Sequence, residues 1–193
     1  MGEGLMKMSD MPKILVFAGP NGSGKSTITD AYDIDGMYIN ADEIKKVKSC
    51  SDLDAANEAE QLREDCLKSG RSFTFETVLS TRRNLDFLIR AKSAGFYISC
   101  VVVLTIDPEI NVLRVKSRVL DGGHDVPNDK IRSRYTKSLA NIAELVSLCN
   151  QCRIFDNTNV PEIIYYEDEH EASLYENAYW SQEQIGQLLG NAI

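Results

Sequence analysis

The stretch that decides the fold of this chain is Gly19-Pro20-Asn21-Gly22-Ser23-Gly24-Lys25-Ser26, which fits the phosphate-binding pattern G-x-x-x-x-G-K-[ST]. It directly follows the apolar run 13–18, which has the length of a strand, and residues 26–31 can open a helix. Glycines let the backbone curl so that successive N–H groups point at phosphate oxygens, and the helix N-terminus adds favourable partial charge. The strand and helix context favours a phosphate-binding loop over an ordinary glycine-rich turn.

The loop assigns chemistry to particular side chains. The Lys25 ammonium can reach the β- and γ-phosphates of a nucleotide, and the Ser26 hydroxyl can ligate magnesium. ATP and Mg²⁺ are therefore the expected cofactors. The residues that we expect to bind the nucleotide are Gly19, Pro20, Asn21, Gly22, Ser23, Gly24, Lys25, Ser26, Thr27 and Asn157.

Length and charge bound the remaining possibilities. At 193 residues the chain suits one α/β domain, which we expect over residues 12–193 after a flexible leader at 1–11. The net charge of −8 argues against nucleic-acid binding, which relies on neutralising a phosphate backbone. A local basic pocket can still hold a small anion. No segment has the uninterrupted apolar length that spans a bilayer, so no membrane role is expected.

The five cysteines form no paired framework. Cys149 and Cys152 make a lone C-x-x-C without a second pair, which gives little support to a zinc or redox site. Reduced thiols and a cytoplasmic location are the simpler account.

Apolar runs of strand length alternate with helical patterns along the chain. The apolar runs lie at 13–18, 37–40, 72–76, 97–106 and 152–156. The helical patterns lie at 53–69, 82–94 and 128–150. This alternation predicts an α/β three-layer sandwich with a central parallel sheet covered on both faces. Residues 161–166 can add a sixth, edge strand, and a last helix is expected near 181–190.

In an open parallel sheet the ligand sits beyond the carboxyl ends of the strands, so polar residues directly after each apolar run are candidates. Asp42 follows the second run at the start of a helix. It is either a helix cap or a carboxylate that orients a substrate hydroxyl and accepts its proton during phosphoryl transfer. After the fifth run, Asp156-Asn157-Thr158 can contact the nucleotide base or hold a loop in place.

Glu76 and Thr77 end the third run, and Arg82 follows a few residues later. A carboxylate at position 76 can hold magnesium through water or bind a substrate hydroxyl. The structural alternative is an ion pair between Glu76 and Arg82 or Arg83. We expect Asp42, Glu76, Thr77 and Arg82 to bind the substrate, and Ser26 and Glu76 to bind the metal.

A basic segment stands out against the acidic chain. Between positions 114 and 137, seven Lys and Arg residues accompany three Asp residues, a local excess of four positive charges. The segment 120–127, which contains two glycines, joins two arginine-bearing helices. This arrangement predicts a lid around 110–137. Guanidinium groups of Arg118, Arg132 and Arg134 could neutralise charge on the transferred phosphoryl group. A solvated helix face is the alternative.

Together these motifs resemble those of the zeta toxins and their shorter zeta-like relatives among the P-loop kinases. The resemblance rests on residues 18–27, 39–44, 75–80, 122–127, 132–135 and 138–141, in the family's order. It implies a nucleoside-kinase-like P-loop fold in which Lys25 and Ser26 bind ATP and magnesium. It also implies that Asp42 is the catalytic base, and that Glu76 and Thr77 contact the substrate or magnesium.

The characterised toxins of the family are ATP-dependent kinases that phosphorylate the 3′-hydroxyl of UDP-N-acetylglucosamine and are neutralised by an antitoxin. The resemblance therefore implies a phosphotransferase with an alcohol acceptor, a nucleotide sugar as one candidate substrate and an antitoxin protein as one candidate partner. This chain is shorter than a typical zeta toxin and lacks much of the C-terminal region that helps build the sugar-nucleotide pocket.

The leading hypothesis is a small-molecule kinase in which Lys25 and the lid arginines stabilise the negative charge while Asp42 orients the acceptor hydroxyl. The main alternative is a nucleotide-dependent switch that closes its lid on ATP to engage an antitoxin-like protein. A switch has no use for a positioned base, so the role of Asp42 separates the two hypotheses. A kinase of a polynucleotide end or an antibiotic hydroxyl is a third option, and the acidic charge counts against the polynucleotide.

Overall fold

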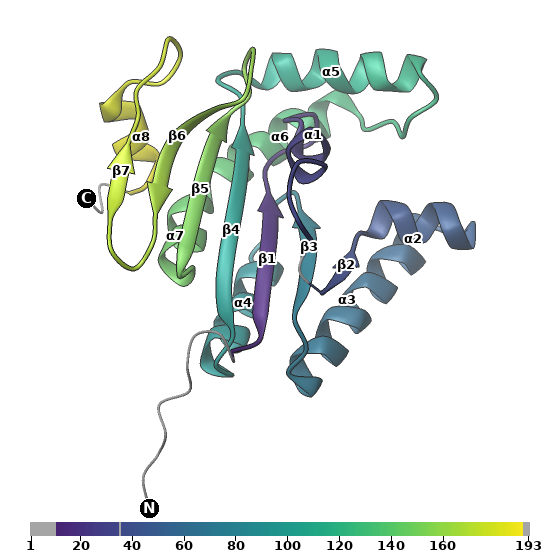
Figure 1. Ribbon diagram of the computed structural model, residues 1–193. Helices are drawn as coiled ribbons and strands as arrows, with labels where there is room; N and C mark the ends of the chain where they lie inside the picture. Colours follow the sequence, from purple (N-terminus) through teal and green to yellow (C-terminus); the bar gives the residue numbers. More distant parts are fainter. Residues whose placement is uncertain (1–10, 35, 191–193) are drawn as a thin grey trace, which may run out of the picture.

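A computed structural model of the chain describes residues 11–34 and 36–190, so the predicted leader lies almost entirely outside the described residues. One sheet dominates these residues, with helices packed against it (Figure 1). Its strands are β1 (Lys13–Ala18), β2 (Met37–Ile39), β3 (Phe73–Thr77), β4 (Tyr97–Leu104), β5 (Gln151–Asp156), β6 (Glu162–Glu167) and β7 (Ala172–Leu174). The helices are α1 (Lys25–Thr29), α2 (Ala41–Lys48), α3 (Asp52–Ser69), α4 (Arg83–Ser93), α5 (Pro108–Leu120), α6 (Asn128–Ala140), α7 (Ile142–Leu148) and α8 (Gln182–Leu188).

The strand order is β2-β3-β1-β4-β5-β6-β7, and the five strands from β2 to β5 are parallel. This confirms the predicted α/β fold with a central parallel sheet. The sheet is mixed at one side, because β6 runs antiparallel to β5 and β7 antiparallel to β6. The strand expected at 161–166 is therefore not the edge. β7 is the edge strand, and its three residues follow an acidic stretch that gives no apolar run.

The two faces of β1 pack against different helices, which produces the three layers. Ile14 and Val16 belong to a large buried cluster that includes side chains of α3, α4, α7 and α8. Phe17 points to the other face, where it packs with Ile28 of α1 in a smaller cluster. Successive residues of a strand face opposite sides of a sheet, so the apolar run 13–18 serves both cores.

The helical pattern at 128–150 forms two helices instead of one, because the chain breaks at Asn141. The Asn141 side chain donates a hydrogen bond to the Leu79 carbonyl at 2.8 Å. Leu79 has a left-handed backbone with φ of 58°, which is unfavourable for a leucine and needs support from its surroundings. The residue at the break between α6 and α7 therefore also supports the turn after β3.

The topology places the glycine loop at the point where the strand order reverses. β1 lies between β3 and β4, so β2 and β3 are placed on one side of it and the later strands on the other. The loop between β1 and α1 leaves from the carboxyl end of β1, and α5 and α6 lie beyond that same end of the sheet (Figure 1). A crevice at such a switch point is where open α/β sheets bind their ligands.

Candidate functional site

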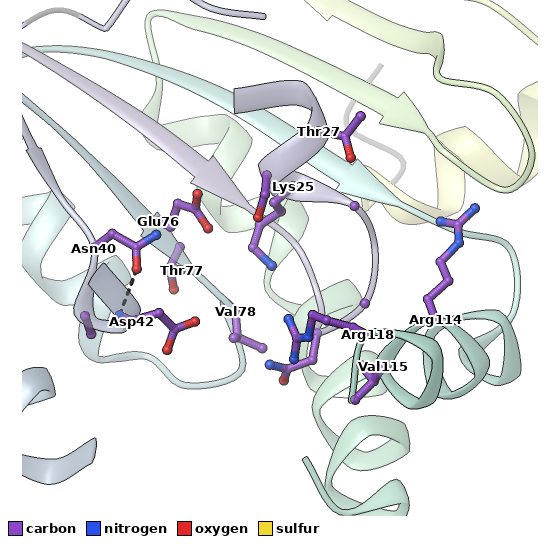
Figure 2. Close-up of a pocket in the computed structure, with 15 residues that line it drawn as sticks. Lys25, Thr27, Asn40, Asp42, Glu76, Thr77, Val78, Arg114, Val115 and Arg118 are labelled. Atoms are coloured by element: carbon purple, nitrogen blue, oxygen red, sulfur yellow. Dashed lines mark hydrogen bonds between the residues drawn. The ribbon is translucent and has the colours of Figure 1, made fainter. Parts of the chain in front are cut away.

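A cavity of about 390 Å³ opens beside the glycine loop. Figure 2 shows Asp42 and Glu76 on one side of it and Arg114 and Arg118 on the other, with Lys25 between them. The loop, the start of α2, the end of β3 and the helix α5 each contribute a wall. The lining residues are Asn21, Gly22, Gly24, Lys25, Ser26, Thr27, Asn40, Ala41, Asp42, Glu76, Thr77, Val78, Arg114, Val115 and Arg118.

All three glycines of the loop lack room for a side chain, as Gly19 and Gly24 illustrate. A Cβ atom on Gly19 would lie 2.1 Å from the Val103 carbonyl oxygen, and one on Gly24 would lie 2.1 Å from Nδ2 of Asn157. Both glycines also have positive φ, at 145° and 91°. The glycine pattern is therefore required by close packing as well as by backbone conformation.

Two buried asparagines hold the loop by side-chain hydrogen bonds to its backbone carbonyls. Asn157, 7% exposed, donates from Nδ2 to the Ser23 carbonyl at 2.8 Å, and Asn111, 0% exposed, donates to the Asn21 carbonyl at 2.8 Å. We predicted that Asn157 contacts the nucleotide, but its amide lies against the loop and the residue does not line the cavity. The loop-holding alternative fits this geometry. Asn111 was missed by sequence analysis, although a polar residue on the apolar face of α5 was an available signal.

Removing the Asn157 amide should weaken both the fold and the site. In Asn157→Ala the Ser23 carbonyl loses its partner, which we expect to cost about 1–3 kcal/mol in the free energy of unfolding and to reduce ATP affinity roughly tenfold. Chemical denaturation and ATP titration measure the two effects. Asn159→Ala, an exposed residue two positions along the same segment, is the matched control. An unchanged ATP affinity in Asn157→Ala would contradict the supporting role.

Lys25 lies at the centre of the cavity in a partly desolvated position. Its Nζ donates hydrogen bonds to the carbonyls of Gly19 at 2.8 Å and Pro20 at 3.1 Å. Burial lowers the pKa of Lys25 from 10.5 to about 8, although the negative charges of Glu76 and Asp42 act in the opposite direction. The lysine therefore lies close to its titration point at neutral to mildly alkaline pH.

This pKa predicts a pH dependence of ATP binding. Lys25 loses its positive charge as the pH rises through about 8, so ATP affinity should then fall, approaching about tenfold per pH unit. ATP titrations between pH 6.5 and 9.5 measure the effect. Lys25→Arg should flatten the profile, because arginine stays charged throughout this range. A flat profile in the unchanged protein would contradict the prediction.

The lowered pKa of Lys25 affects the stability of the fold in the opposite direction to ATP affinity. Between about pH 8 and 10.5 the unfolded chain binds more protons at Lys25 than the folded protein does. The contribution of Lys25 to stability should therefore rise with pH in this window.

Asp42 is not the cap of α2. Asn40 occupies the cap position, and its side-chain oxygen accepts a hydrogen bond from the Asp42 backbone N–H at 2.8 Å (Figure 2). The Asp42 carboxylate is exposed and lines the cavity from the first turn of α2. The capping alternative for Asp42 is therefore wrong, and its carboxylate remains available to a ligand.

Glu76 is held by hydroxyl groups. Its Oε1 accepts hydrogen bonds from the Tyr38 hydroxyl at 2.5 Å and from the Thr29 hydroxyl at 3.4 Å. The ion-pair alternative is wrong, because Arg82 pairs with Glu144 and Arg83 pairs with Glu60.

Tyr38 was missed by sequence analysis, because nothing in the strand β2 distinguishes a tyrosine that packs from one that positions a carboxylate. The Asn40 side chain also donates to its hydroxyl, at 3.1 Å. Burial and the bond to Glu76 raise the pKa of Tyr38 above its ordinary value, so Tyr38 stays protonated as a donor.

The residues predicted to hold magnesium fit that ion. Ser26 and Glu76 line the same cavity and offer the hard oxygen ligands that Mg²⁺ prefers. Both hydrogen bonds to Glu76 use Oε1, which leaves Oε2 for a direct or water-mediated contact.

Thr77 lines the cavity, but its hydroxyl also organises the turn after β3. The oxygen accepts hydrogen bonds from the Leu79 N–H at 2.9 Å and from Asn84 Nδ2 at 2.6 Å. The hydroxyl proton remains able to donate to a ligand. Thr77 thus combines a position in the site with support of the strained Leu79 turn.

Two arginines of α5 face the cavity. Arg118, a predicted catalytic residue, lines it and donates from Nη2 to the His124 carbonyl at 2.8 Å. Arg114 also lines the cavity and donates to the Thr158 carbonyl at 3.2 Å. They sit four residues apart on one helix face, so the i, i+4 spacing in the sequence was the signal for Arg114.

The other predicted arginines are placed differently. Arg134 of α6 donates to the Asn21 side chain at 3.2 Å, so it contacts the glycine loop without lining the cavity. Arg132 forms a two-contact ion pair with Glu109, at 2.5 and 2.9 Å, and Arg82 pairs with Glu144 on α7. Neither Arg132 nor Arg82 lines the cavity; each is paired with an acidic neighbour instead.

The chain also matches known proteins. The model of the Zeta toxin family matches residues 3–179 of the chain. An uncharacterised protein from Haemophilus influenzae is 32% identical over 129 residues, which cover 64% of this chain and 92% of that protein.

Solved structures share the fold. One, from the PezAT toxin–antitoxin system of Streptococcus pneumoniae, has a TM-score of 0.62 at 17% identity and covers 98% of this chain and 87% of that one. The complex of AvrRxo1-ORF1 with AvrRxo1-ORF2, solved with ATP, gives a TM-score of 0.69 at 17% identity. That match covers 95% of this chain and 65% of the longer one.

Proposed function

Since the chain belongs to the Zeta toxin family, we propose that it is an ATP-dependent kinase that transfers the γ-phosphoryl group of ATP to a hydroxyl of a small molecule. One observation carries the proposal: the glycine loop with Lys25 and the uncommitted carboxylate of Asp42 line the same cavity. The first supplies a place for the phosphate donor and the second a place for the acceptor hydroxyl.

The residues suggest how the transfer proceeds. The acceptor hydroxyl donates a hydrogen bond to the Asp42 carboxylate, and its oxygen attacks the γ-phosphorus as its proton passes to Asp42. The bond from the γ-phosphorus to the bridging oxygen breaks, and ADP leaves with that oxygen. Lys25 and Arg118 lie where positive charge can stabilise the phosphoryl oxygens. Magnesium bound by Ser26 and Glu76 would add charge neutralisation at the phosphates.

The pair α5 and α6 would form the lid of this kinase-like domain, which we propose spans residues 12–193. Val112 and Val115 of α5 pack with Ile131 of α6 in an apolar cluster separate from the two clusters of the sheet. A pair of helices with its own small core can shift as a unit over the nucleotide. Arg114, Arg118 and Arg134 would then move with the lid towards the phosphates.

UDP-N-acetylglucosamine is the first acceptor to test, because it is the acceptor that the family resemblance implies. A protein partner of the antitoxin type is proposed on the same ground. One of the solved neighbours comes from a toxin–antitoxin system, and another is a complex of two proteins. No helix in the described part of the chain is long and apolar enough to cross a membrane.

The test is incubation with γ-labelled ATP, magnesium and a panel of hydroxyl compounds, followed by mass spectrometry of the products. We expect an acceptor to gain one phosphate, with ADP formed in equal amount. The switch hypothesis predicts that ATP binds but no acceptor becomes labelled. That outcome would remove the kinase proposal without affecting the nucleotide site.

A further inference from the structure

A chain of hydrogen bonds links the helix that carries Asp42 to the carboxylate of Glu76. The Asn40 side-chain oxygen accepts from the Asp42 backbone N–H at 2.8 Å, the bond dashed in Figure 2. The Nδ2 of Asn40 donates to the Tyr38 hydroxyl at 3.1 Å, and that hydroxyl donates to Oε1 of Glu76 at 2.5 Å. The segment 38–42 therefore connects the proposed base to the proposed metal ligand.

The protons available fix the direction of each bond in this chain. An ionised carboxylate only accepts hydrogen bonds, so the single proton of the Tyr38 hydroxyl goes to Glu76. The hydroxyl oxygen can then only accept, which requires the NH₂ side of Asn40 to face it. The oxygen of Asn40 is left for the Asp42 N–H, which needs an acceptor because it lies in the first turn of α2. One orientation of Asn40 satisfies all of these groups.

Tyr38 is the committed donor to Glu76 within the described residues. The Thr29 hydroxyl lies 3.4 Å from Oε1 of Glu76 but 3.0 Å from the Lys25 backbone carbonyl, and its single proton serves one acceptor at a time. Helical threonines often bond to the carbonyl four residues earlier. The orientation of the Glu76 carboxylate therefore depends mainly on Tyr38.

We propose that Tyr38 and Asn40 are positioning residues for metal-assisted phosphoryl transfer. They hold Oε1 of Glu76, which leaves Oε2 for the magnesium that accompanies ATP, and they tie this carboxylate to the helix that presents Asp42. The proposal rests on the kinase function proposed above. Outer partners that orient a metal ligand commonly contribute as much to metal affinity as this requires, because the ligand loses less freedom when the metal binds.

Tyr38 acts through Glu76, because it does not line the cavity beside the glycine loop. It does border a neighbouring hollow of about 430 Å³, which Asp42 also lines and from which a tyrosine could touch an acceptor directly. A direct contact would change acceptor binding and leave metal binding unaltered. Metal affinity measured without an acceptor therefore separates a positioning role from a contact with substrate.

The test uses Mn²⁺ as the probe, because the free ion is measured by electron paramagnetic resonance. Each protein is titrated with Mn²⁺ in the presence of a non-hydrolysable ATP analogue and without any acceptor. In Tyr38→Phe we expect Mn²⁺ affinity to fall about tenfold, at the low end of the range for loss of an outer partner of a metal ligand. Affinity for the analogue in EDTA should stay unchanged, because Tyr38 lies outside the cavity.

Tyr166→Phe is the matched control. The Tyr166 hydroxyl also donates to a carboxylate, Oδ2 of Asp168 at 2.6 Å, and neither residue lines the cavity. The same oxygen is removed from the same kind of bond, so a purely structural loss should appear in both variants. We expect Tyr166→Phe to retain its Mn²⁺ affinity. Thermal unfolding of both variants measures what the lost bond costs in stability.

A substitution at Asn40 tests the rest of the chain. Serine caps a helix about as well as asparagine and adds no charge, so Asn40→Ser keeps the start of α2 and removes the amide donor to Tyr38. We expect Mn²⁺ affinity to fall about threefold, because Tyr38 loses a hydrogen bond that fixes it but keeps its bond to Glu76. The double variant Tyr38→Phe/Asn40→Ser should bind Mn²⁺ no more weakly than Tyr38→Phe alone, because Asn40 acts through Tyr38.

The outcomes separate this proposal from the kinase function. Unchanged Mn²⁺ affinity in Tyr38→Phe, or an equal loss in Tyr166→Phe, overturns the positioning role and leaves the kinase proposal intact. Losses that multiply in the double variant overturn the role of Asn40. If Tyr38→Phe does not fold, unchanged Mn²⁺ affinity in Asn40→Ser overturns the proposal instead. Failure of every acceptor to gain phosphate overturns the kinase function, while the Mn²⁺ titrations still decide the role of Tyr38.

Discussion

Replacing Asp42 by asparagine is expected to slow phosphoryl transfer about 10²–10⁴-fold, the range for loss of a positioned general base, while ATP binding changes little. An asparagine keeps the shape of the side chain but cannot accept the hydroxyl proton. The cap of α2 is unaffected, because Asn40 provides it through the backbone N–H of residue 42. The change therefore removes the base without removing the local structure.

One side effect is expected at the lysine. The charge of Asp42 raises the pKa of Lys25, so Asp42→Asn should move the alkaline fall in ATP affinity to lower pH. Single-turnover rates and ATP titrations at pH 7 measure the two effects separately.

Asp129→Asn is the matched control for this change. Asp129 is an exposed aspartate in the first turn of α6, and it does not line the cavity. The substitution Asp129→Asn also removes one negative charge from a helix N-terminus, which costs about 0.3–1 kcal/mol in the free energy of unfolding. If Asp42→Asn transfers phosphate as fast as the unchanged protein does, Asp42 is not the base, and the switch hypothesis gains support.

Replacing Lys25 by alanine is expected to lower the rate of transfer about 10²–10³-fold, the effect of removing one preorganised charge from a transition state. ATP affinity should fall as well, because the same ammonium serves the bound phosphates. In the folded protein the Lys25 ammonium rests on the Gly19 and Pro20 carbonyls, so it is already held beside the loop. Steady-state rates over a range of ATP concentrations separate the fall in kcat from the rise in KM.

Lys116→Ala removes the same charge from an exposed position on α5 and should leave both constants unchanged. A Lys25→Ala protein that retained its kcat, with only KM raised, would show that the lysine contributes to binding and not to the transfer step.

The fold was predictable to a large extent because its signals are local. All five parallel strands were expected from apolar runs, and the loop 19–26 was placed between strand and helix. β7 was missed because three residues without an apolar pattern form a strand only when β6 is there to pair with. The break at Asn141 was missed because no glycine or proline marks it in the sequence.

The site was predictable in part. The positions of Asp42 and Glu76 at one cavity follow from the rule that strand ends share an edge of the sheet, whereas Arg118 was selected from the basic segment 114–137. The choice between Arg114 and Arg132 did not follow. Both lie in the same basic segment, and only packing directs one to the cavity and the other to Glu109.

The sequence by itself determined that a loop of the phosphate-binding pattern lies beside a parallel sheet, because the glycine loop, its strand and its helix are specified within about twenty neighbouring residues. Tertiary structure alone decided which polar side chains are bonded to other parts of the protein and which are available to a ligand. Asn157 holds a loop 134 residues away, and Tyr38 holds Glu76 across 38 residues. Such pairings depend on how strands and helices pack, and no local pattern encodes them.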